Sequence, residues 1–236
     1  MSNLAFLNSP FKIQLSLPRE HGIVVIFSIA SLFSLIVQVN SGPFCAAIIF
    51  LWLLVLSMQN PRQLTALTIS GALFSVLINP LLALWLLIVG LSLLLIKISR
   101  SKHSLLLEFT GLGGATLTPL MTAYLINPDG KILLTIATAL MAAVYSSAAI
   151  VHGVIHLSGK GNHERMRAIL NMILALPFWI GFALLDPSAS RLSLIAYIGL
   201  ILWLHKSKTT SLKELGMLSA FCLTWVSLTL LLTLRI

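Results

Sequence analysis

The sequence predicts an all-α fold: a polytopic transmembrane helical bundle forming a single transmembrane domain over residues 1–236. Hydrophobic residues make up 58% of the chain and charged residues only 9%, with a mean hydropathy of +1.02. Soluble domains carry about 25% charged residues. The apolar residues also gather in long runs, and a membrane-spanning helix needs about 20 of them. The lipid bilayer is therefore the first partner that the sequence implies.

Division of the chain at Pro, Gly, Asn and charge clusters predicts nine spans. The expected spans are 22–39, 43–58, 64–78, 81–98, 105–126, 132–157, 168–185, 192–204 and 215–234. The segment 1–21 is expected to be cytoplasmic, and the first span lacks a signal-peptide cleavage site. The third and eighth spans are short and could be tilted, broken or partly inserted. The joint Asn79-Pro80 predicts a tight antiparallel pair of the third and fourth helices.

Basic residues support this count and set its orientation. With the N-terminus inside, three of the 15 Lys and Arg residues, Lys131, Arg191 and Arg235, fall outside and the other twelve fall inside. Loop Lys and Arg concentrate on the cytoplasmic side, so we predict an N-in, C-out topology. The same rule explains the net charge of +9, and no nucleic-acid partner is expected. Cys45 and Cys222 lie in different spans, so no disulfide is expected.

Unusual polar residues fall mostly at or near the predicted inner face, whereas the outer half holds little besides Asp129 and Asp186. This one-sided polarity predicts a polar cavity that opens to the cytoplasm, although loops are polar on either side. The candidates to line the cavity or bind a ligand are Glu20, His21, Arg62, Glu108, His152, His156 and Arg165.

Glu108 is the strongest single candidate, because it interrupts an apolar run about one turn inside the fifth span. A carboxylate there should face the bundle interior and find a cation or stay protonated. It could accept a proton or bind a cation, or it could form an interhelical salt bridge with an arginine. The glycines that follow, Gly111, Gly113 and Gly114, would allow close helix approach.

His152 and His156 project from one face of the sixth span, since they are four residues apart. This spacing suits two ligands of one metal ion or two contacts to a ligand head group, and it equally suits histidines that only pack. Gly153 follows His152, so the zinc-protease motif HExxH is absent. A third metal ligand could come from His21 or Glu108.

Arg62, Arg165 and Arg167 could clamp an anionic head group, because a guanidinium matches phosphate geometry. They could equally face lipid phosphates as topology signals. The sequence shows neither a phosphate-binding glycine loop nor a Ser/His/Asp arrangement, so it assigns no catalytic residue.

The stretch Pro18-Arg19-Glu20-His21-Gly22 resembles the signature of YwiC-like bacterial membrane proteins. These proteins open their first span with a Pro-basic-acidic or amide-His-Gly motif, usually followed by Ala-Trp, where this chain has Ile23-Val24. The approach to the fifth span, Ser101-Lys102-His103-Ser104, is also similar to that family. The resemblance implies a bacterial inner membrane or a chloroplast-type equivalent, but no activity.

Residues 106–113, Leu-Leu-Glu-Phe-Thr-Gly-Leu-Gly, resemble more distantly a helix of the UbiA-type intramembrane prenyltransferases. This resemblance implies a UbiA-like arrangement of nine helices with a cytoplasm-facing cavity. Those enzymes hold magnesium on an isoprenyl diphosphate with two Asp-rich motifs. The corresponding stretches here, 57–62 and 152–156, contain no Asp. Because magnesium prefers carboxylate oxygens, a standard magnesium-dependent prenyl transfer is not expected.

Three functions remain open at this point. The first, which we favour, is binding of an isoprenoid, quinone or tetrapyrrole-like (pigment-like) lipid in the cytoplasm-facing cavity. The second is a small transporter that uses Glu108 with His152 and His156 as a proton or metal relay. The third is an accessory subunit of a larger membrane complex. The sequence identifies no cofactor and leaves open whether the protein is an enzyme, which would then be a non-standard UbiA-like transferase.

Overall fold

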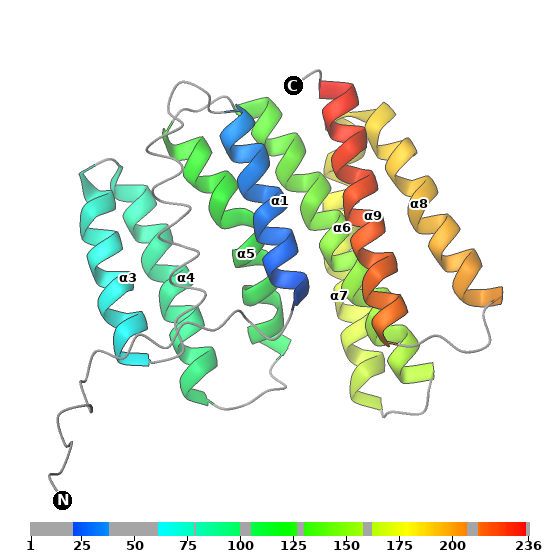
Figure 1. The fold of residues 1–236 in the computed structure, drawn as a ribbon, viewed down its shortest axis with the longest axis horizontal. Coiled ribbons are helices and arrows are strands. Elements are labelled where there is room, and N and C mark those ends of the chain that lie inside the picture. The colour runs from blue at the N-terminus through cyan, green and yellow to red at the C-terminus, as the bar shows by residue number, and fades with distance from the viewer. Residues whose placement is uncertain are drawn as a thin grey trace, which may run out of the picture.

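The computed structural model describes residues 21–37, 61–77, 79–99, 105–126, 130–157, 162–206 and 212–234, and every element within these ranges is an α-helix. The helices, drawn in Figure 1, are α1 (His21–Val37), α3 (Pro61–Val76), α4 (Pro80–Ser99), α5 (Leu105–Ile126), α6 (Gly130–Leu157), α7 (Asn162–Leu185), α8 (Pro187–Lys206) and α9 (Leu212–Leu234). The all-α prediction is confirmed for this part of the chain. The expected span 43–58 lies outside the described residues.

Three described helical stretches are long and apolar enough to cross a membrane: Gly130–Leu157, His163–Leu185 and Met217–Leu234. Shorter apolar stretches occur in α1, α3, α4 and α8. Large apolar side chains also stand on the outer surface, among them Leu184 and Leu232, which are 80% and 77% exposed. Such extensive apolar exposure is unusual for a soluble protein and fits a surface that faces lipid.

From α3 to α9 successive helices alternate in direction, so the bundle has two ends (Figure 1). At one end α6 finishes and α7 begins, together with the starts of α1, α3, α5 and α9; we call it the His152 end. At the other end α5 finishes and α6 begins, together with the starts of α4 and α8; we call it the Lys131 end. Helices α1 and α3 run in the same direction, so Val37 and Pro61 lie at opposite ends.

Most helix limits agree with the apolar runs, and α5 has the expected limits. Two helices begin at least five residues earlier than expected. Helix α7 starts at Asn162 rather than at 168, so residues 162–167, which the predicted span left out, are helical. Helix α8 starts at Pro187 rather than at 192 and has 20 residues, so it is not the short element predicted. Its start is stabilised by Asp186, whose Oδ1 accepts the Ala189 N–H at 2.9 Å, and by proline at the first helical position.

The Asn79-Pro80 joint forms the tight turn predicted between α3 and α4, which pack side by side (Figure 1). Asn79 Oδ1 accepts the Leu81 N–H at 2.9 Å, which caps the start of α4. Its Nδ2 donates to the Leu125 carbonyl oxygen at 3.1 Å, near the end of α5. One side chain thus fixes the turn and attaches it to a third helix.

Helix α6 forms the centre of the described bundle, because it packs most extensively against α7 and also contacts α5, α9 and α1. Small residues bring neighbouring helices close to one another. A Cβ at Gly113 of α5 would lie 3.0 Å from Tyr145 Oη on α6, and one at Gly114 would lie 3.4 Å from Val89 of α4. The predicted close approach of helices at the α5 glycines is confirmed at these two positions.

Buried hydroxyl groups connect α6 to α7 and α8 inside the apolar region. Tyr197 Oη of α8 donates to the Ala143 carbonyl at 2.8 Å and lies 3.1 Å from Ser147 Oγ. Trp179 Nε1 of α7 donates to Ser146 Oγ at 2.8 Å. Polar groups in a bilayer need internal partners, so these contacts fix how the three helices meet.

Candidate functional site

The polar cluster at the His152 end joins the last turns of α6 to the first turns of α7. His152 Nδ1 lies 2.6 Å from Glu164 Oε2, and Arg167 Nη1 lies 3.7 Å from Glu164 Oε1. The side chains of His152, Glu164 and Arg167 are only 14%, 17% and 10% exposed. One mostly buried carboxylate therefore faces two basic groups. Their opposite charge and hydrogen bonding offset the cost of removing the carboxylate from water.

The helical start at Asn162 explains how this cluster forms. It puts Glu164 in the first turn of α7, where the helix dipole favours an acid. It also puts Arg167 three residues after Glu164, a spacing at which side chains on a helix meet. Asn171 continues the same face, fully buried, and its Nδ2 donates to the Arg167 carbonyl at 3.0 Å.

Six of the seven candidate residues fall in described helices, and their helical positions place all six toward the His152 end. His21 begins α1 and Glu108 lies in the first turns of α5, but the side chains of both are outside the described residues, as is the whole of Glu20. Arg62 and Arg165 are exposed, and His156 is partly buried. The convergence of Glu20, His21 and Glu108 on one cavity stays a prediction.

Of the candidates, His152 belongs to the polar cluster, and its partner Glu164 was not one of the candidates. Arg167, considered as an anion clamp, instead lies beside the same carboxylate. A sequence signal for Glu164 existed: an acid two residues after Asn162 fits a helix start, where acidic residues are favoured. Among the described residues, no group of three or more His, Cys, Asp and Glu side chains is placed to hold a metal ion.

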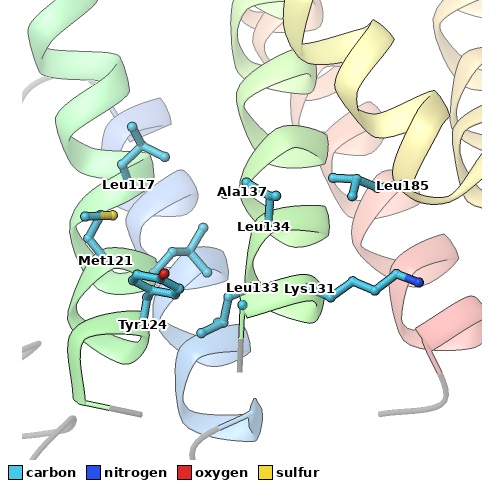
Figure 2. Close-up of a pocket in the computed structure, with 10 residues that line it drawn as sticks. Leu117, Met121, Tyr124, Lys131, Leu133, Leu134, Ala137 and Leu185 are labelled. Carbon is cyan, nitrogen blue, oxygen red and sulfur yellow. The ribbon is translucent and has the colours of Figure 1, made fainter. Parts of the chain in front are cut away.

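A pocket of about 370 Å³ lies at the opposite, Lys131 end of the bundle. Its walls come from the end of α5, the start of α6 and the end of α7. The lining residues are Leu117, Leu120, Met121, Tyr124, Gly130, Lys131, Leu133, Leu134, Ala137 and Leu185. Figure 2 shows Leu117, Met121 and Tyr124 on one side and the α6 residues on the other. Lys131 extends away from Tyr124, on the side of Leu185.

The pocket is almost entirely apolar, and none of the seven candidate residues lines it. Two of its lining residues carry polar groups: Tyr124 has a hydroxyl, and Lys131, which is exposed, has an ammonium on the side of Leu185 (Figure 2). The lining positions on α5 and on α6 each recur at three- and four-residue spacing, so each helix contributes one face. Such faces look like ordinary packing faces in a sequence, which explains why sequence reasoning missed this pocket.

The geometry separates two chemical environments within the described residues: an ion-paired cluster between α6 and α7, and an apolar pocket near the other end of α6. The first can hold helices together, and the second can accept a hydrocarbon chain. No protein-family model, no curated protein and no solved structure matches this chain.

Proposed function

We propose that this is a multi-pass membrane protein that binds an amphipathic lipid, such as an isoprenoid or a quinone, with the lipid chain between α5, α6 and α7. The observation that carries the proposal is the pocket of about 370 Å³, whose walls are apolar apart from two lining residues with polar side chains, Tyr124 and Lys131. Ligand sites typically measure about 300–1,000 Å³ and combine apolar walls with a few placed polar groups. Lipid binding remains the favoured function, but the proposed chain site lies away from the cytoplasm-facing cavity expected from sequence.

A nine-span, N-in topology similar to the UbiA-type arrangement is part of this proposal. The described helices support it through their alternating directions and through the position of Val37 and Pro61 at opposite ends of the bundle. An N-in topology puts the His152 end in the cytoplasm and the lipid pocket near the outer face. YwiC-like proteins remain the family that the Pro18–Gly22 stretch resembles, and the location in a bacterial-type membrane rests on that resemblance.

Native mass spectrometry of gently extracted protein tests the lipid-binding proposal. We expect a prenyl or quinone-type lipid to remain bound to the unaltered chain. Ala137→Phe should displace it, because Ala137 lines the pocket and a phenyl ring would fill the space. Ala183→Phe is the matched control, since Ala183 is exposed on α7 and does not line the pocket.

The proposal fails if no lipid of this kind is found with the unaltered protein. It also fails if Ala137→Phe and Ala183→Phe retain the same amount of lipid. A fluorescence-based thermal unfolding curve for each variant shows whether loss of lipid reflects loss of folding. A variant that is folded but has a filled pocket should unfold near the melting temperature of the unaltered protein.

A further inference from the structure

Lys131 gives the pocket a charge that the proposed lipid binding does not by itself require. We infer that the polar end of the bound lipid is anionic, a phosphate or a carboxylate, and lies beside Lys131. This inference rests on the proposed function, because it concerns the head of the lipid whose chain the pocket would hold. It favours an anionic amphiphile over a neutral one such as a quinone.

The charges of the lining residues point in this direction. Of the ten described lining residues, Lys131 carries the positive charge and none is acidic. Tyr124 supplies a neutral hydroxyl, and the other eight side chains offer no charged or hydrogen-bonding group. A chain that enters between α5 and α6 therefore meets a cation at the same end of the bundle.

The position of Lys131 in its helix strengthens the positive electrostatic potential beside the pocket. Gly130 and Lys131 are the first two residues of α6, and both line the pocket. The first N–H groups of a helix have no intrahelical acceptor, and the helix dipole adds positive potential there. The lysine stem is flexible and keeps its ammonium at the polar edge of an apolar surface.

The acid that follows the lining residue Leu185 already has a hydrogen-bond donor. Asp186 follows the lining residue Leu185, but its carboxylate accepts the Ala189 N–H at 2.9 Å and so caps α8. A phosphate or carboxylate on the lipid would give Lys131 a counter-charge, and a charge-assisted hydrogen bond is stronger than one to a neutral hydroxyl.

Photo-crosslinking in nanodiscs of a neutral phosphatidylcholine tests the inference. Three probes with the same diazirine-bearing chain would be compared: an alkyl phosphate, a fatty acid and a fatty alcohol. We expect both anionic probes to label residues 117–137 more strongly than the alcohol by about fivefold, the size of one partly exposed ionic contact. The Lys131→Gln variant should remove the difference, and Lys131→Arg should restore it.

Arg191→Gln provides the matched control, because Arg191 is an exposed cation in the first turns of α8 and does not line the pocket. It should leave the preference for anionic probes unchanged. Equal labelling by acid, phosphate and alcohol, or a preference that survives Lys131→Gln, would overturn the inference while leaving lipid binding intact. Absence of labelling of residues 117–137 by all three probes would overturn the proposed function as well.

Discussion

Glu164 is the residue on which the ion-paired cluster at the His152 end depends. One carboxylate oxygen lies 2.6 Å from His152 Nδ1 on α6, and the other lies 3.7 Å from Arg167 Nη1 on its own helix. Burial of a charge is costly unless opposite charge and hydrogen bonds compensate it. Glu164 supplies this compensation for the Arg167 guanidinium, and its contact with His152 joins α6 to α7.

Replacement of Glu164 by Gln should therefore destabilise the protein. The variant keeps the side-chain volume but leaves mostly buried basic groups without their carboxylate, which costs about 2–4 kcal/mol. Thermal unfolding in detergent micelles would measure the loss. Glu214→Gln is the control, because Glu214 is an exposed acid in the first turn of α9. Equal melting temperatures for the two variants would show that the cluster contributes little.

Single residues also show where sequence reasoning about the site ends. His152 stands out in sequence because it is a polar residue in an apolar run. Its pairing with Glu164, 12 positions later, depends on the start of α7 and on how tightly α6 and α7 pack. Lys131 was visible only as an outer charge, since the pocket beside it exists only when three helices are assembled. Hydropathy and charge carry no information on such contacts between helices.

At the scale of helix pairs, close backbone approach replaces the hydrophobic effect, which is weak between helices surrounded by lipid. The α3–α4 pair shows this most clearly. A Cβ at Gly90 would lie 2.1 Å from Thr68 Cγ2 and 2.7 Å from Thr68 Oγ1. Thr68 is buried, and its hydroxyl is among the buried polar atoms without a hydrogen-bond partner. The close packing of α3 and α4 therefore depends on the lack of a side chain at Gly90, which leaves room for the buried Thr68 side chain.

Gly90→Ala should destabilise the α3–α4 pair by about 1–3 kcal/mol, the usual cost of overpacking. Thr68→Ala alone should be close to neutral, because it removes an unsatisfied hydroxyl together with some packing. In the double variant most of the Gly90→Ala cost should disappear, since the clashing atoms are gone. Unfolding of all three variants in micelles gives the coupling energy of this double-mutant cycle.

Gly199→Ala on α8 is the control for this cycle, because a Cβ there has no neighbour within 4 Å. It should be neutral or slightly stabilising, as alanine is the better helix former. A destabilisation by Gly90→Ala that persists unchanged in the Thr68→Ala background would contradict the steric explanation.

Helices were more predictable than their contacts. The apolar runs and the Asn79-Pro80 joint located most described helices, since length and hydropathy determine what can cross a bilayer. The predicted starts of the seventh and eighth spans lie several residues after the starts of α7 and α8, because the first turns of these helices are polar, as at His163 and Ser188. A polar first turn can belong to the helix, but hydropathy alone begins the span at the first apolar residue.

The whole molecule has a chemical polarity along the helix axes. The ion-paired cluster and the helical candidate residues lie toward the His152 end, whereas the apolar pocket with Lys131 lies at the other. The charge pattern predicts that the His152 end faces the cytoplasm. If so, an amphipathic ligand in the pocket would enter from the outer leaflet, and the ion-paired cluster would face a separate, cytoplasmic environment.

The accessibility of single cysteines at the start of α7 and at the start of α8 tests this orientation. In a background with Cys45 and Cys222 replaced by Ala, His163→Cys would report the start of α7 and Ser188→Cys the start of α8, and both native residues are exposed. Helix α7 has 24 residues, so its length of about 36 Å exceeds the hydrocarbon core of about 30 Å. We expect a membrane-impermeant maleimide to label Ser188→Cys in intact cells and His163→Cys only after permeabilisation.

The reverse pattern would invert the topology and move the pocket to the cytoplasmic face. Labelling of both cysteines from outside would show that α7 does not separate the two compartments.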